Sequence, residues 1–191
     1  MPINSKRLKP LSYAELNDSQ RSLWDSIVDG PRGRTVIDSE GHLRGPFEVL
    51  LRSPVVGQAI SRVGESLRFG DCLPAALLEL AILTTASHWK SDFEWDSHYP
   101  LAIAAGHTPE ALAQVKAGRK PTSLGPEASC VYDVVREMVV TGRCSDELFA
   151  KAMTHLGEKR LADVAGVSGY YTLLAMQLGV FAVGPEIVKP A

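Results

Sequence analysis

Apolar residues along this chain recur mostly at steps of three and four, and strictly alternating stretches are almost absent. A stripe with that period lies along one side of a helix, whereas a half-buried strand alternates at every second residue. The clearest stripe, at steps i, i+3, i+4, i+7 and i+8, consists of Val131, Val134, Val135, Met138 and Val139. The pattern therefore predicts an all-α protein with core-facing helices.

Start and stop signals divide the pattern into separate helices. The first is expected to begin near Asn17, whose side chain can cap it, and to end at Gly30-Pro31. Proline suits a first helical turn, because its missing N–H has no intrahelical partner there. Further starts are expected near Pro46, Pro54, Pro74, Ser91, Thr108, Ser145 and Glu158, and four residues should be buried in the first helix, namely Leu23, Trp24, Ile27 and Val28.

The last predicted helix, roughly 158–181, contains Gly166, Gly169 and Gly179. Glycine weakens a helix but lets a neighbouring backbone approach closely. The three glycines therefore suggest either a tightly packed bundle or a subunit interface along this helix.

One long segment, residues 31–45, lacks any regular period and is rich in Gly, Arg and Pro. We expect a loop that contributes no core element, and loops of that length are functional or mobile. Residues 1–45 thus read as an N-terminal helix and long loop extension, and residues 46–191 as the main helical domain. A chain of 191 residues suits one compact unit overall.

Composition narrows the classes of function. Net charge is −2, 22% of residues are charged and no Lys/Arg-rich block is present, so we expect no nucleic-acid partner. The N-terminus lacks the apolar core of a signal peptide, and Glu79 interrupts the longest apolar run, so we expect no membrane span. These features favour a cytoplasmic protein. Three well-separated cysteines, Cys72, Cys130 and Cys144, agree with a reducing compartment and are best explained as packing residues or exposed thiols.

The stretch SDFEWDSH, residues 91–98, concentrates the candidate chemistry. On a helix, Ser91, Glu94 and His98 share one face, while Asp92 and Asp96 lie on another that we expect to be solvated. A carboxylate one turn from an imidazole can form an acid/base couple. An ordinary Glu–His surface pair remains the alternative.

Glu79 is the only charged residue between Leu73 and Ser87. A buried, unpaired carboxylate is costly, so it should find a cationic or donor partner. His88, Lys90 and His98 are the candidates nearby, and the pair could serve a site or simply join two helices.

A metal or cofactor site finds little support. Glu79, Glu94 and His98 offer suitable ligand atoms, but their spacing is neither H-E-x-x-H nor the Glu-x-x-His of di-iron bundles. The sequence also has no Gly-rich phosphate loop and no G-x-S-x-G motif. We expect neither a metal nor a cofactor.

Residues 74–118, PAALLELAILTTASHWKSDFEWDSHYPLAIAAGHTPEALAQVKAG, resemble the carboxymuconolactone decarboxylase family, which includes the alkylhydroperoxidase D-like (AhpD-like) proteins. The resemblance rests on the lone Glu79, the E-W-x-x-H run, the A-x-x-A-G helix end and the T-P-E cap, all in register. The hydroperoxidase branch has the motif E-x11-C-x2-C-x3-H, and here the same frame reads Glu79, Ser91, Glu94 and His98. Because Ser and Glu cannot form a disulfide, the thiol mechanism is not expected at that position.

The resemblance implies an AhpD-like all-α fold that assembles as homo-trimers or hexamers. Its decarboxylase branch implies a cofactor-independent acid/base lyase or isomerase, acting on a small carboxylated lactone or enol from aromatic catabolism. His98 would donate the proton, Glu94 would orient the ring and Glu79 would tune the pair. Ser91, Tyr99 and His88 would bind the substrate.

Three further expectations stay open. A loop arginine, Arg32, Arg34 or Arg44, could bind a substrate carboxylate, although solvated side chains are the simpler reading. Thiol-dependent peroxide reduction could use the cysteines outside the motif. Alternatively, the chain could be a binding or assembly protein in which Glu79, Glu94 and His98 form a buried polar latch.

Overall fold

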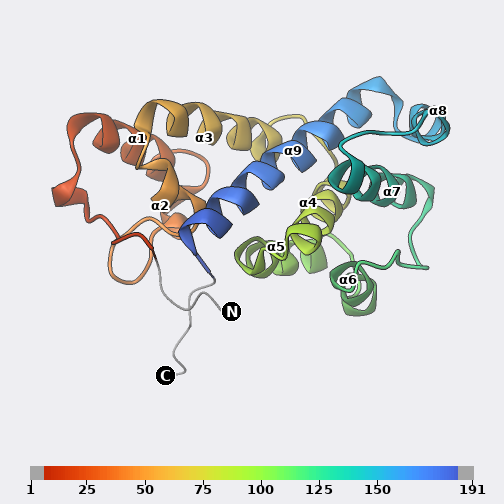
Figure 1. The fold of residues 1–191 in the computed structure, drawn as a ribbon, viewed down its shortest axis with the longest axis horizontal. Coiled ribbons are helices and arrows are strands. Elements are labelled where there is room, and N and C mark those ends of the chain that lie inside the picture. The colour runs from red at the N-terminus through yellow and green to blue at the C-terminus, as the bar shows by residue number, and fades with distance from the viewer. Residues whose placement is uncertain (1–6, 185–191) are drawn as a thin grey trace. The chain divides into compact units, whose positions relative to one another are not determined.

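The computed structural model describes residues 7–184, and within that range it is all-α, with a single isolated β-bridge and no strand. The chain divides into two compact units (Figure 1). Unit 1 comprises the residues up to Gly70 together with those from Met176 onward, and unit 2 comprises Asp71–Ala175. The sequence-based division at residue 45 stays a prediction.

Unit 1 is built from α1 (Asp18–Val28), α2 (Pro46–Leu50) and α3 (Pro54–Phe69), with short 3-10 turns at Tyr13–Glu15 and Gly33–Val36. The predicted start of α1 is confirmed, because Asn17 Oδ1 accepts a 3.0 Å hydrogen bond from the backbone N–H of Gln20. All four residues predicted to face its core are buried: Leu23, Trp24, Ile27 and Val28.

The segment 31–45 is a loop, as predicted, with one 3-10 turn, but it contributes buried residues to the core. Val36 and Leu43 are buried in the same apolar cluster as the inner face of α1, and Ile37 bridges Leu43. Arg32 is 7% exposed, and its Nη1 lies 2.6 Å from Glu65 Oε1 on α3. Local sequence missed this because the partners of these residues lie far away along the chain. Arg32 is therefore not a solvated loop side chain.

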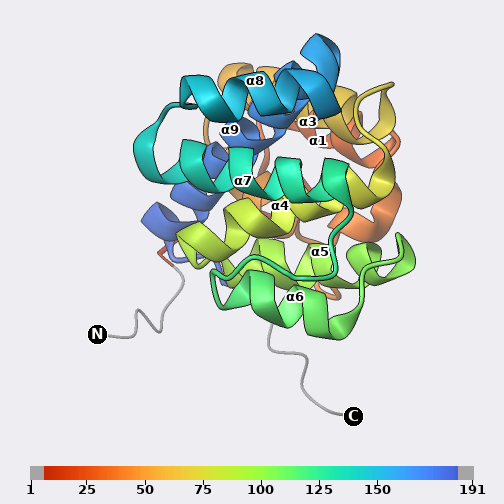
Figure 2. The same ribbon diagram turned by 90° about the vertical axis from the view of Figure 1, so that its right-hand side faces the viewer.

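Unit 2 contains six helices: α4 (Ala75–Trp89), α5 (Asp92–Ala104), α6 (Pro109–Lys116), α7 (Pro126–Thr141), α8 (Asp146–His155) and the main part of α9 (Gly157–Phe181). The central helix is α4, which packs against α5 and α7 on different sides (Figure 2). Every residue from Leu77 to Ala86 is buried, as expected of a helix surrounded by others.

The predicted stripe on α7 is confirmed at its start. Val131, Val134 and Val135 are fully buried, while Met138 and Val139 are only half-buried. The stripe thus faces the core over the first turns of the helix and leaves it toward the C-terminal end.

The close approach predicted at the glycines of α9 is not found at two of them. Among the described residues, a Cβ added to Gly169 or Gly179 would meet no atom within 4 Å. By length and composition α9 alone among the described helices could cross a membrane. Its most apolar 18-residue window has a mean hydropathy of 1.3, and 44% of that window is buried inside the protein. The expected absence of a membrane span and the cytoplasmic location stay predictions.

Candidate active site

Two neighbouring helices of unit 2 bring Glu79 and His98 together. Lys90 adopts a left-handed conformation, with φ 52° and ψ 40°, that ends α4 and lets α5 begin at Asp92. The two helices form an αα-hairpin joined by a minimal link. His98 Nδ1 lies 2.7 Å from Glu79 Oε2, so the partner of the buried carboxylate is His98 rather than His88 or Lys90.

The second ring nitrogen of His98 faces two further groups. Tyr171 Oη, from α9, lies 3.2 Å from His98 Nε2, and Glu94 Oε2 lies 3.7 Å from the same nitrogen. The rings of His98 and Tyr171 meet edge to face, with centroids 5.1 Å apart. Each nitrogen of the imidazole therefore has an oxygen partner of its own.

All four side chains are removed from solvent. Glu79 is 6% exposed, Glu94 3%, His98 4% and Tyr171 2%. A carboxylate only accepts hydrogen bonds, so an ionised Glu79 requires the hydrogen on Nδ1 of the ring. Nε2 then either accepts from the Tyr171 hydroxyl or holds a second proton near Glu94. Two buried carboxylates therefore lie beside one imidazole ring, Glu79 at Nδ1 and Glu94 at Nε2.

Tyr171 is the member of this cluster that sequence reasoning missed. It lies 73 positions from His98 along the chain, on a helix whose pattern signals only packing. The adjacent Tyr170 packs edge to face on it at 5.3 Å. No local signal distinguishes Tyr171 from the other tyrosines.

Ser91 occupies the N-cap position of α5, as predicted, but its hydroxyl does not cap the helix. Its backbone carbonyl accepts the 3.0 Å bond from the Trp95 N–H, while Oγ is buried and has no hydrogen-bond partner among the described residues. Glu94 follows one turn later, and Asp92 and Asp96 are exposed on the other face, as predicted. The buried face of α5 is thus the one the spacing identified.

Tyr99 and His88, the other predicted substrate-binding residues, lie outside the cluster. Tyr99 is half-buried and packs against the apolar residues around Trp95, with ring centroids 6.3 Å apart. His88 lies nine residues beyond Glu79 on α4, about 13 Å along the helix axis. Burial, and then the charge of Arg136, lower the pKa of His88.

The three cysteines are all free thiols. Cys130 is fully buried, while Cys72 and Cys144 are partly buried. Burial raises the pKa of each thiol, and the charge of Glu137 adds to the effect at Cys144. Across residues 7–184, no group of three or more His, Cys, Asp and Glu side chains is placed to hold a metal ion.

Comparison with known proteins supports the family resemblance. Residues 54–137 match the sequence profile of the Carboxymuconolactone decarboxylase family. That range includes α4, α5 and α6 and three of the four clustered residues, Glu79, Glu94 and His98. No match is found among curated proteins.

Solved structures share the fold at low sequence identity. An alkylhydroperoxidase AhpD core, an uncharacterized peroxidase-related protein from Ralstonia eutropha JMP134, is 15% identical with a TM-score of 0.75, and the match covers 95% of this chain and 92% of that one. An uncharacterized peroxidase-related protein from Silicibacter sp. TM1040 is 13% identical, with a TM-score of 0.72 and coverage of 97% and 94%.

A third structure, a putative antioxidant defence protein AhpD from Agrobacterium tumefaciens, is 14% identical with a TM-score of 0.64, and the match covers 75% of this chain and 99% of that one. At these identities the likeness concerns the fold alone. Residues 54–137 therefore belong to the Carboxymuconolactone decarboxylase family, and the chain has the all-α fold of the AhpD-like proteins.

Proposed function

We propose that this protein is a cofactor-independent acid/base enzyme, a decarboxylase or double-bond isomerase of small carboxylated lactones or enols. The observation that supports it most is that the buried His98 ring is contacted at both nitrogens, by Glu79 at Nδ1 and by Tyr171 at Nε2. A buried imidazole fixed on both sides suits proton transfer to a reacting carbon.

Decarboxylation would proceed in two steps. The bond between the substrate carbon and its carboxylate breaks, carbon dioxide leaves, and the electron pair enters a dienolate. His98 then donates a proton to the carbon and regains one from water, so one proton is consumed for each carbon dioxide released. Glu79 holds the ring and compensates its positive charge, while Glu94 lies beside the donating nitrogen.

Hydroxyl groups next to the ring would stabilise the dienolate oxygen. Tyr171 Oη already reaches His98 Nε2, and Ser91 Oγ is a buried hydroxyl on the same face of α5. Donors aimed at a developing oxyanion in a water-poor site are among the strongest catalytic contributions. In isomerisation the same groups act, but His98 first removes the proton that it later returns.

The test is turnover of a panel of small carboxylated lactones and enols, including carboxymuconolactone, followed by release of carbon dioxide and by ultraviolet absorbance. His98→Ala should lower kcat/KM by about 10²–10⁴-fold, the usual contribution of a general acid. Asp96→Asn, an exposed carboxylate on the same helix, serves as the control. Equal turnover by wild type and His98→Ala would reject the proposal.

Peroxide reduction is the second candidate, because two of the structural neighbours are described as peroxidase-related. Ser91 and Glu94 stand at the motif's two thiol positions, so cysteines elsewhere would have to react. Peroxide consumption by wild type and by a triple Cys→Ser variant distinguishes the cases: loss in the variant favours the peroxidase, and equal rates reject it.

A non-catalytic binding or assembly protein is the third candidate, supported by the burial of the cluster. The ion pair would then act as a latch between α4 and α5. In that case His98→Ala would lose thermal stability, and no substrate in the panel would be turned over.

We also propose that the chain self-associates as a trimer or hexamer. Support comes from α9, where Leu173, Met176 and Val180, at helical steps of three and four, are 37%, 49% and 59% exposed. Gly169 lies on the same face and leaves room for a neighbouring backbone. Molar mass measured by light scattering tests this directly, and a monomer at micromolar concentration would reject it.

A further inference from the structure

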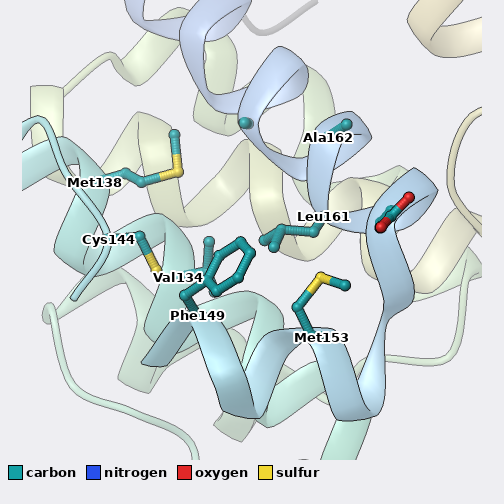
Figure 3. A pocket seen from close by; sticks show the side chains of 9 residues that line it. Val134, Met138, Cys144, Phe149, Met153, Leu161 and Ala162 are labelled. Carbon is teal, nitrogen blue, oxygen red and sulfur yellow. The ribbon is translucent and has the colours of Figure 1, made fainter. Parts of the chain in front are cut away.

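An apolar cavity that is open to solvent lies in unit 2, between α7, α8 and the start of α9. Its volume is about 480 Å³. Figure 3 shows the side chains of Phe149 and Leu161 pointing toward one another inside it, with Met138 and Met153 on either side. The fully buried Val134 lines it from α7.

This cavity is separate from the acid/base cluster. Neither α4 nor α5, which hold Glu79, Glu94 and His98, contributes a lining residue. On α9 the lining ends at Ala165, and Tyr171 lies six residues further, about 9 Å along the helix axis. The proposed catalytic function therefore leaves this cavity unexplained.

The size of the cavity suits a small ligand. Ligand pockets commonly enclose about 300–1,000 Å³, and an apolar cavity of about 150 Å³ is enough for benzene. A volume of about 480 Å³ gives room for a two-ring aromatic or a medium-length alkyl chain. The thioethers of Met138 and Met153 are flexible and polarisable, so they can adapt to such ligands.

The charges around the cavity argue against an anionic ligand. Glu158 is the one lining residue with a charged side chain at neutral pH. The two cations that follow it already form ion pairs, Lys159 with Asp163 at 3.1 Å and Arg160 with Glu127 at 3.0 Å. A carboxylate or phosphate head group would meet the negative charge of Glu158, while both of these neighbouring cations already have carboxylate partners.

We propose that the cavity between α7, α8 and α9 binds a neutral, apolar small molecule with two aromatic rings or an alkyl chain of similar size. The binding is independent of the acid/base cluster, none of whose residues lines the cavity. A ligand of this class is chemically distinct from the carboxylated substrates proposed for the cluster.

The probe is N-phenyl-1-naphthylamine, a neutral aromatic dye whose fluorescence rises in apolar surroundings, titrated into the full-length protein. We expect saturable binding at one site per chain. Dodecanol should displace the dye at concentrations at least tenfold lower than dodecanoate does. Glu158→Gln should narrow that difference by improving dodecanoate and leaving dodecanol unchanged.

Two matched substitutions locate the dye. Ala162 is an exposed alanine of α9 that lines the cavity, and Ala150 is an exposed alanine of α8 that does not. Ala162→Phe fills the space and should weaken binding at least tenfold, whereas Ala150→Phe should bind the dye as wild type does.

Three results would overturn the proposal: no saturable binding, equal binding by the Ala162→Phe and Ala150→Phe variants, or dodecanoate displacing the dye as well as dodecanol does. Light scattering on the same samples tests whether a second copy of the chain occupies the cavity instead. If wild type binds no dye and Ala162→Phe alone lowers the molar mass, a second copy of the chain fills the cavity and the proposal fails.

Discussion

His98 Nδ1 and Glu79 Oε2 lie 2.7 Å apart, joining α5 to α4 through two side chains that are both almost fully buried. A buried pair of this kind contributes little net stability compared with an apolar pair. Removing one member, however, leaves the other as a buried charge without a partner, which is strongly destabilising. The pairing therefore predicts an effect on stability that can be measured without any substrate.

His98→Ala should destabilise the fold by about 3–5 kcal/mol, because Glu79 and Glu94 lose the group between them. Urea unfolding followed by circular dichroism measures the change. Asp96→Ala, on the exposed face of α5, should stay within about 0.5 kcal/mol of wild type. If both variants unfold at the same urea concentration, the 2.7 Å contact between His98 and Glu79 does not stabilise the fold in solution.

Tyr171→Phe should separate the effect of the hydroxyl from that of the aromatic ring, because it deletes the contact to His98 Nε2 and keeps the edge-to-face packing. We expect a loss of about 1–3 kcal/mol in stability, the cost of leaving a buried polar atom without its partner. The ¹⁵N chemical shift of Nε2 should also move, which a purely packing role would not cause.

Tyr99→Phe is the matched control for that experiment, since Tyr99 lies on α5, where its ring packs beside Trp95. We expect unchanged ¹⁵N shifts of His98 in this variant. A rise in KM for a turned-over substrate would support the prediction from sequence that Tyr99 binds the substrate.

Alkylation rates should report the raised pKa of the thiols. Burial is the largest cause of the raised pKa at Cys72, Cys130 and Cys144, and it favours the protonated thiol. Since the thiolate is the nucleophile, each should react with iodoacetamide more slowly than glutathione at pH 7 and accelerate as the pH rises beyond 8. Mass spectrometry of the modified peptides gives the rates. A cysteine that outpaces glutathione at pH 7 would revive the peroxidase candidate.

Much of the helical framework could be predicted because its signals are local. Asn17, Pro54, Thr108 and Ser145 each mark a helix start that the structure confirms within a residue. Caps and apolar periods act over one or two turns, so a single sequence contains them. The face of α5 with Glu94 and His98 follows from the same short-range geometry.

The partners that these side chains contact in the tertiary structure could not be predicted from local sequence signals. Sequence left Glu79 with three candidate partners, and the choice of His98 depends on the left-handed turn at Lys90, a residue with no strong preference for that conformation. Tyr171 joins the cluster from α9, and Arg32 finds Glu65 from 33 positions away. Such contacts depend on packing, which local pattern does not encode.

The ion pair of Arg32 and Glu65 predicts an asymmetry between its two halves. The Arg32 side chain is 3% exposed and that of Glu65 28%, so only the carboxylate can be hydrated if its partner is lost. Glu65→Ala would leave the guanidinium buried between Ser61 and the ring of Phe47, and should cost about 3 kcal/mol or more. Arg32→Leu replaces the buried charge with an apolar group of similar reach, and should cost about 1 kcal/mol. Urea unfolding of both variants, with the exposed Arg62→Ala as control, shows which substitution costs more stability. A larger loss of stability for Arg32→Leu than for Glu65→Ala would mean that the guanidinium is hydrated in solution.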